Sequence, residues 1–79
     1  MYKDEKKEAD QVVFGVVADF VYKLNIRAEP DLEADVIFEA EPGTEFMIDI
    51  ENSTEEWFSV CSTSGIEGFC KKKYIAIKE

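Results

Sequence analysis

This chain of 79 residues lacks some of the residue types that catalytic sites use and is rich in others. It has no histidine, so neither a Ser-His nor a Cys-His nucleophile pair can be assembled. Carboxylates are abundant, but glycoside hydrolysis needs two of them facing each other across a cleft, and a domain of this size rarely encloses one. We therefore predict that the chain has no catalytic residues and is not an enzyme.

Three carboxylates in residues 31–35 have the spacing of calcium ligands in an EF-hand loop. Asp31, Glu33 and Asp35 occupy the first, third and fifth positions of an EF-hand-like loop. The sixth position, where glycine makes the sharp turn, is Val36, and the twelfth, where a bidentate glutamate belongs, is Pro42. We predict no metal site here and expect no cofactor.

The two cysteines, Cys61 and Cys70, lie on the two arms of a predicted hairpin. If Gly65-Ile66 forms a two-residue turn they are directly opposite, and if Ser64-Gly65 forms it they are diagonal on the same face. A bulge in the loop, which Gly65 permits, would put them on opposite faces. All three registers stay open, and we favour unpaired thiols over a disulfide.

The charge balance limits the class of partner. With 9 basic and 18 acidic residues the formal charge is −9, which argues against nucleic acid and other polyanions as ligands. Every charged residue from Ala28 through Glu56 is acidic, whereas Lys71, Lys72 and Lys73 are grouped near the end. Such a run is typical of a solvated face. The functional alternative is a cationic ligand, such as a peptide with free amines, attracted by the acidic loops.

Nothing in the sequence indicates insertion into a membrane. No apolar run is long enough to span one. Residues 1–11, MYKDEKKEADQ, are polar where a secretory signal would be apolar, so we predict that they are a flexible polar lead or linker. Residues 12–79 then form one small domain, which we expect to be monomeric in isolation.

The elements that must position any site are short strands. Alternation of apolar and polar residues, together with Gly, Pro and Asn turns, predicts an all-β domain, a small partly open barrel of five to six strands. Residues 41–44 suit a type II turn, and residues 30–35 suit one helical turn with Leu32 packed inward. The predicted strands are Val12–Tyr22 (interrupted at Gly15 by a bulge or close approach, and followed by a loop near Asp19), Leu24–Arg27, Val36–Ala40, Glu45–Glu51, Trp57–Ser62 and Gly68–Lys72, and residues 74–77 close the chain.

The same alternation predicts the core. In residues 45–51 three apolar side chains, Phe46, Ile48 and Ile50, should share the inner face of the barrel. Across the chain, the residues expected to be nearly fully buried are Leu24, Ile26, Val36, Phe46, Ile48 and Val60.

Leu24 to Pro30, LNIRAEP, resembles L-N-[VI]-R-x-x-P, the opening signature of bacterial SH3 (SH3b) domains. Further matches follow at the spacing of that family over roughly 60 residues, about the size of one such domain. They are Gly15-Val16-Val17 for "G-x-V", Val36-Ile37, Pro42-Gly43-Thr44 for the "K-G-T" turn, Trp57-Phe58-Ser59-Val60 for "W-Y-K-V", Gly68-Phe69-Cys70 for "G-W-V", and Tyr74-Ile75 for the terminal "Y-[LIV]".

The resemblance implies an SH3-like barrel and a non-catalytic binding or targeting module of a bacterial envelope protein. Such a module would recognise peptidoglycan peptides or a protein partner, in an extracellular or cell-envelope location, as part of a longer chain. The alternative is a structural accessory domain that packs against a neighbouring hydrolase domain of the same chain. Gly68 to Lys71 contains no proline where eukaryotic SH3 domains carry one, so recognition of proline-rich peptides is not supported.

The resemblance also implies a candidate ligand groove built from aromatic residues. In SH3-like barrels the positions matching Trp57, Phe69 and Tyr74 tend to share a surface between the loops, and Tyr22 could join them. Strand parity places Trp57 on the face opposite Phe58. Since Trp57 follows a polar loop, we predict that it is partly exposed. The candidate ligand-binding residues are Trp57, Phe69, Tyr74 and Tyr22, with Glu55 and Glu56 at the rim.

Overall fold

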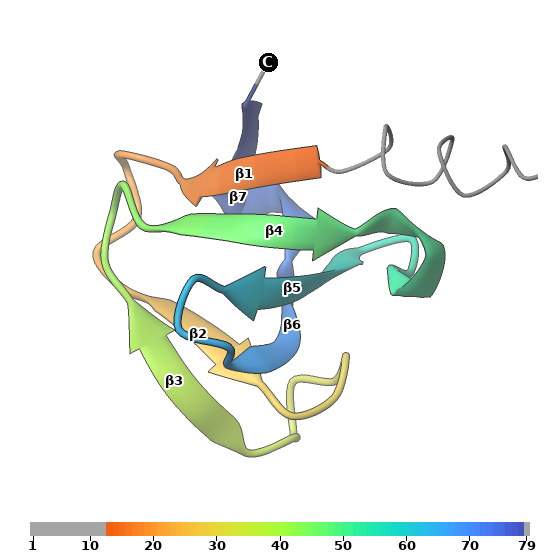
Figure 1. The fold of residues 1–79 in the computed structure, drawn as a ribbon. Coiled ribbons are helices and arrows are strands. Elements are labelled where there is room, and N and C mark those ends of the chain that lie inside the picture. Colours follow the sequence, from red (N-terminus) through yellow and green to blue (C-terminus); the bar gives the residue numbers. More distant parts are fainter. Residues whose placement is uncertain (1–12, 79) are drawn as a thin grey trace, which may run out of the picture.

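The computed structural model describes residues 13–78, which form seven short strands and two single turns of 3₁₀ helix (Figure 1). Every strand pairing is antiparallel, and the strands join one sheet in the order β3-β2-β6-β5-β4-β1-β7. The elements are β1 (Val13–Val17), β2 (Leu24–Arg27), β3 (Val36–Ala40), β4 (Glu45–Asp49), η1 (Ile50–Asn52), β5 (Trp57–Ser62), β6 (Glu67–Lys71), η2 (Lys72–Tyr74) and β7 (Ile75–Lys78). The predicted lead, 1–11, lies outside the described residues.

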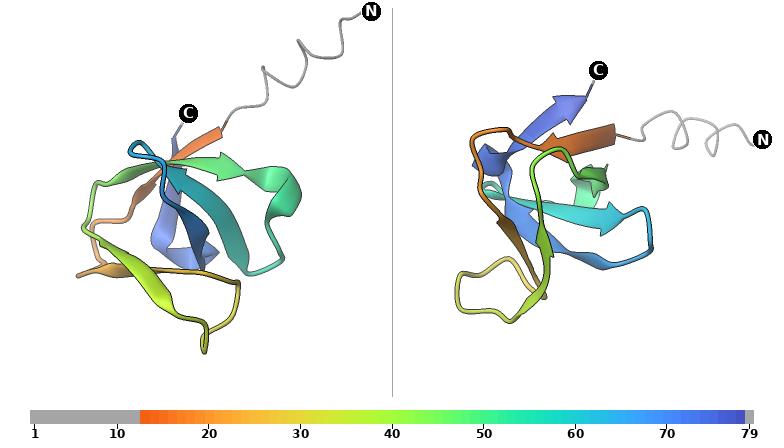
Figure 2. Two further views of the ribbon diagram at one scale, coloured as in Figure 1. Left: turned by 60° about the horizontal axis from the view of Figure 1, so that its bottom comes forward. Right: turned by 90° about the vertical axis from the view of Figure 1, so that its left-hand side faces the viewer.

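The sheet curls around a single interior without closing, as the two views in Figure 2 show. Its two end strands are β3 and β7, which do not pair with each other within residues 13–78. The β2–β3 hairpin joins the remaining strands through one pairing, Arg27 opposite Phe69, so the sheet bends sharply there. The all-β class and the small, partly open SH3-like architecture are confirmed, with seven strands where five to six were predicted.

The core lies on the inner face of this curled sheet. Five of the six residues that alternation predicted to be buried are there, with exposed fractions of 5% or less. Burial of such side chains is the main favourable term that a domain this small has. The confirmed residues are Leu24, Ile26, Phe46, Ile48 and Val60, and Val17, Val21, Ala40, Phe58 and Cys70 complete the cluster.

The sixth predicted core residue, Val36, is 42% exposed, so that prediction was wrong. The ladder between β2 and β3 shifts register: Ile26 pairs with Phe38, but Arg27 pairs with Val36, which leaves Ile37 as an extra residue. Because an extra residue reverses strand parity beyond it, Val36 shares the outer face with Arg27.

Ile50 is also outside the core, at 55% exposed, in contrast to the prediction from the pattern of residues 45–51. Strand β4 ends at Asp49, whose carboxylate accepts hydrogen bonds from the backbone N–H (3.4 Å) and the side-chain amide (2.7 Å) of Asn52. This cap turns the chain into η1, and the period of two stops before Ile50.

Leu32 is 62% exposed, so its predicted inward packing was wrong. Residues 30–35 form a turn rather than a helix: the Asp31 carboxylate accepts from the Glu33 N–H at 2.9 Å, and the Asp31 carbonyl accepts from the Ala34 N–H at 3.0 Å. The side chain of Leu32 projects from this turn into the groove described below.

The two glycines singled out by the sequence behave as expected. Gly43 has φ +88°, and Thr44 N–H donates to the Glu41 carbonyl at 3.1 Å, which confirms the type II turn. At Gly15 the ladder to β4 is regular, and a Cβ there would lie 2.6 Å from Ile75 Cγ2. Gly15 therefore allows a close approach and forms no bulge.

Among the residues that the structure describes, no helix is long or apolar enough to cross a membrane.

Candidate binding groove

A groove of about 430 Å³ lies on the surface between the β1–β2 loop and the start of β5. Residues from distant parts of the chain line it: the loop itself, β2, the turn after β2, the first residue of β5, the last residue of β6, and η2. The lining residues are Phe20, Val21, Tyr22, Lys23, Leu24, Asn25, Arg27, Leu32, Trp57, Lys71 and Tyr74.

Four of the lining side chains are aromatic. Phe20 and Tyr22 are 75% and 87% exposed, although both sit in a loop anchored by the buried Val21. The rings of Phe20 and Tyr74 lie 6.4 Å apart between centroids, at an interplanar angle of 58°. This spacing is typical of an interacting aromatic pair. Both rings line the groove together with Trp57, which is far less exposed than Phe20.

Trp57 is only 7% exposed, so the prediction that it is partly exposed was wrong. The parity argument itself holds, because Trp57 is absent from the core cluster that contains Phe58 and Val60. The loop before it folds back instead of leaving the ring in solvent: Trp57 N–H donates to Thr54 Oγ1 at 3.1 Å, and Thr54 N–H donates to the Trp57 carbonyl at 2.8 Å.

Lys71 covers the indole from the neighbouring strand. It pairs directly with Trp57 in the β5–β6 ladder, and its Nζ lies 5.4 Å from the ring centroid. The same Nζ lies 3.3 Å from Glu56 Oε1, while Lys72 N–H donates to the Glu56 carbonyl at 2.9 Å. The Lys71 ammonium therefore lies over the ring of Trp57. Its ion-pair partner, the Glu56 side chain, is 72% exposed.

The charged lining of the groove is basic. Lys23, Arg27 and Lys71 line it, and within residues 13–78 no carboxylate does. Lys23 Nζ lies 3.5 Å from Glu39 Oε1, and Arg27 Nη1 donates to the Ala34 carbonyl at 2.9 Å. A domain that is acidic overall thus presents cations where its aromatic side chains gather.

The structure brings together three of the six predicted groove residues: Trp57, Tyr74 and Tyr22. Phe69 does not line the groove; it is half-buried on β6, paired with Ser59 and Arg27. Neither Glu55 nor Glu56 lines it, and Glu56 reaches it only through its ion pair with Lys71.

Sequence reasoning missed the exposed Phe20 and Leu32 and all three cations. Phe20 carried a usable signal, because a bulky aromatic residue next to Asp19 in a predicted loop has little chance of burial. Lys71 could have been placed opposite Trp57 only with the hairpin register known. Arg27 belongs to the family signature, but its position beside the groove depends on how β2 crosses β6.

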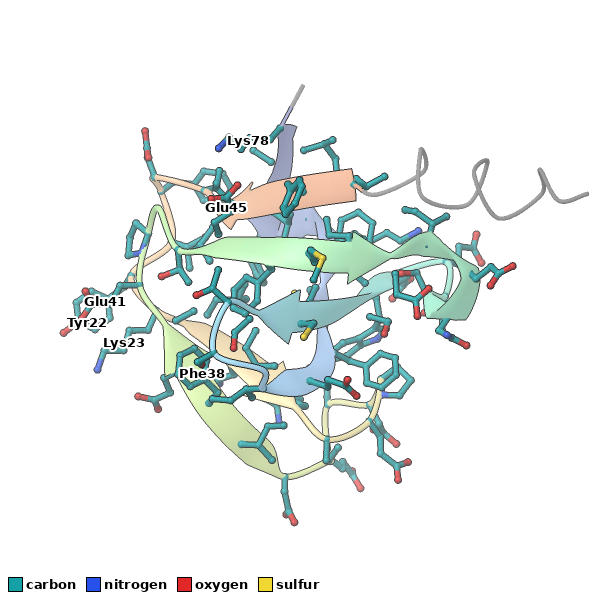
Figure 3. The ribbon with its side chains drawn as sticks, viewed as in Figure 1. Tyr22, Lys23, Phe38, Glu41, Glu45 and Lys78 are labelled. Atoms are coloured by element: carbon teal, nitrogen blue, oxygen red, sulfur yellow. The ribbon has the colours of Figure 1, made fainter. Side chains whose placement is uncertain are left out.

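A second, more open hollow of about 470 Å³ lies on the other side of the same loop. It shares Phe20, Val21, Tyr22 and Lys23 with the groove and adds Asp19, Glu41 and Pro42. In Figure 3, Tyr22, Lys23 and Glu41 project away from the body of the domain at this side. The loop therefore forms an aromatic ridge with a basic hollow on one side and an acidic one on the other.

The two cysteines lie on opposite faces of the β5–β6 hairpin and are unpaired. Cys70 pairs with Phe58, and Cys61 pairs with Glu67. This is the register predicted for a bulge in the loop. Ser62 N–H donates to the Ile66 carbonyl, so the loop consists of the three residues 63–65, and Gly65 has φ +96°. Cys70 is fully buried, and burial raises the pKa of its thiol to about 12.

Within residues 13–78, no three His, Cys, Asp or Glu side chains are placed to hold a metal ion.

An antiparallel sheet curled around one small core, with a shallow aromatic groove beside its loops, defines a compact β-barrel domain of the SH3 type. The family model for the bacterial SH3 domain matches residues 23–76. The chain belongs to the bacterial SH3 domain family, which is a family of binding modules. A comparison with curated proteins gives no match.

Proposed function

We propose that this domain is a non-catalytic module that binds a short peptide in the groove, either a cell-wall peptide or a segment of a partner protein. The proposed setting is an extracellular or envelope protein of which this domain is one part. One observation carries the proposal: four aromatic side chains from three separate segments, Phe20 and Tyr22, Trp57, and Tyr74, converge on one groove.

Exposed rings of this kind need a reason, because burying them would stabilise the domain. Phe20 and Tyr22 remain exposed although the neighbouring Val21 is buried. Aromatic side chains give a large contact area at low cost in conformational entropy, so they are enriched where proteins bind peptides. The volume of the groove lies within the range of small-ligand sites, which suits a few residues of extended peptide.

Titration of the ¹⁵N-labelled domain with peptidoglycan stem peptides tests the proposal. Backbone amides of residues 20–25, 57 and 71–74 should shift together and saturably. Phe20→Ala should weaken binding about 10-fold or more, whereas the matched control Phe14→Ala, a partly exposed phenylalanine of β1 outside the groove, should not. Saturable shifts that leave these amides unmoved would contradict the groove assignment.

A second candidate function, a structural accessory that packs against a neighbouring domain, rests on a different patch. Phe14 and Met47 pair across β1 and β4 and are 41% and 44% exposed. If this face packs against another domain, Met47→Lys in the longer chain should loosen the pair of domains and increase protease cleavage between them. Unchanged cleavage would exclude this role for the patch.

A further inference from the structure

We infer that the groove recognises a carboxylate group on its peptide ligand, with Arg27 as the principal receptor and Lys71 and Lys23 beside it. This inference rests on the proposed function, because it names the ligand chemistry of the same groove. It also reverses the expectation from composition, which favoured a ligand with free amines.

The groove differs from the rest of the chain in the sign of its charge. The chain has twice as many acidic as basic residues, yet the three charged side chains lining the groove are all basic. Glu39 and Glu56 form ion pairs with Lys23 and Lys71, and neither carboxylate lines the groove. Basic side chains on an otherwise acidic surface direct an anionic ligand to one place. They attract its carboxylate, whereas the acidic remainder of the surface repels it.

Arg27 differs from the two lysines of the groove in its bonding partners. Its guanidinium has no carboxylate within 4 Å among residues 13–78, whereas Lys23 and Lys71 each have one. One nitrogen, Nη1, donates to the Ala34 carbonyl at 2.9 Å, which fixes the side chain and leaves further N–H donors for a ligand. A planar, half-buried guanidinium suits a bidentate carboxylate better than any other anion-binding side chain.

Lys71, the neighbouring lysine, can exchange its carboxylate partner for one on the ligand. The Lys71–Glu56 pair is 3.3 Å long, and both of its side chains reach solvent. Such surface pairs contribute little free energy, so a ligand carboxylate can compete with Glu56 for the ammonium. When Lys71 turns toward the ligand, the indole of Trp57 becomes available to the apolar part of the peptide.

The carboxylate can be the C-terminus of a peptide or the side chain of Asp or Glu. Three probes separate these sources: acetyl-Ala-Ala-Ala as the free acid, the same peptide as its C-terminal amide, and acetyl-Ala-Glu-Ala amide. Because Trp57 is the only tryptophan and lies in the groove, its fluorescence reports binding directly. ¹⁵N shifts of the groove residues serve as the second readout.

We expect at least one carboxylate probe to bind about 10-fold or more tightly than the neutral amide. Arg27→Gln should remove that preference, so that the free acid and the neutral amide bind with similar affinity. Lys78→Gln, which removes one positive charge outside the groove, should leave the preference in place. Arg27→Lys, which keeps the charge but loses the planar fork, should give an intermediate loss and provides a second variant if Arg27→Gln fails to fold.

Two outcomes overturn the inference in distinguishable ways. If the neutral amide binds in the groove as tightly as the carboxylate probes, carboxylate recognition is wrong although peptide binding stands. If none of the probes and none of the stem peptides moves the groove resonances, the proposed function fails and this inference fails with it.

Discussion

Lys71 lies directly across the β5–β6 ladder from Trp57, with its ammonium nitrogen 5.4 Å from the centroid of the indole. This relationship explains why a tryptophan outside the core cluster is only 7% exposed. It also couples the groove to the acidic loop, because the same nitrogen is paired with Glu56. The cover is one flexible side chain, so the exposure of Trp57 depends on where that side chain points.

Replacement of this cover is the first prediction. The wild-type indole should emit as a buried tryptophan. Lys71→Ala should shift emission to longer wavelength and increase quenching by acrylamide, because it removes the side chain that covers the ring together with its pairing to Glu56. The loss of stability should stay below about 1 kcal/mol. Lys78→Ala, which breaks only the Lys78–Glu45 pair (both residues are labelled in Figure 3), is the control. Equal spectra for the two variants would show that Lys71 does not shield the ring.

Two isoleucines in one short segment provide the second prediction. Ile48 is 5% exposed in the core, and Ile50, two residues later, is 55% exposed in η1. Ile48→Ala should cost about 2–5 kcal/mol of unfolding free energy, whereas Ile50→Ala should change it by about 0.5 kcal/mol or less. Urea denaturation measures both. Similar losses at the two positions would mean that β4 continues past Asp49.

The third prediction concerns pH and Cys70. Burial raises the pKa of this thiol from 9.0 to about 12 in the folded state, so above pH 9 the unfolded chain loses its proton first. The unfolded state is thereby favoured, and stability should fall as pH rises from about 9 toward 12. Cys70→Val cannot lose this proton and should show a shallower decline. Parallel pH profiles for the two proteins would show that the Cys70 thiol does not cause the decline.

The fourth prediction concerns ionic strength. Among the carboxylates from Asp31 to Glu51, Glu39 and Glu45 have a lysine within 4 Å among the described residues. Self-repulsion of the remainder should destabilise the domain at low salt, so added NaCl should raise the melting temperature modestly, mostly once the Debye length falls below ~10 Å. Glu51→Gln should reduce the salt response, and a melting temperature independent of salt would contradict it.

The strands and most of the core could be predicted from the amino-acid sequence. Alternation is a local property of the chain, and each apolar side chain that alternates within an uninterrupted strand must reach the same face. For that reason Phe46, Ile48 and Val60 were placed correctly, and the type II turn at Gly43 followed from residue types alone. The resemblance to the family signature implied the SH3-like barrel, whereas the order of the strands in the sheet comes from the structure.

The tertiary structure alone determined where the strand alternation is interrupted and which side chains cover each surface. The extra residue at Ile37 and the cap at Asp49 reversed or ended the alternation, so Val36 and Ile50 are exposed. The burial of Trp57 depends on Lys71, which is 14 positions away in the chain and reaches the ring only through the hairpin register. Likewise, the cations of the groove come from a loop, from β2 and from β6, and their convergence is a property of the sheet's curvature that no local pattern encodes.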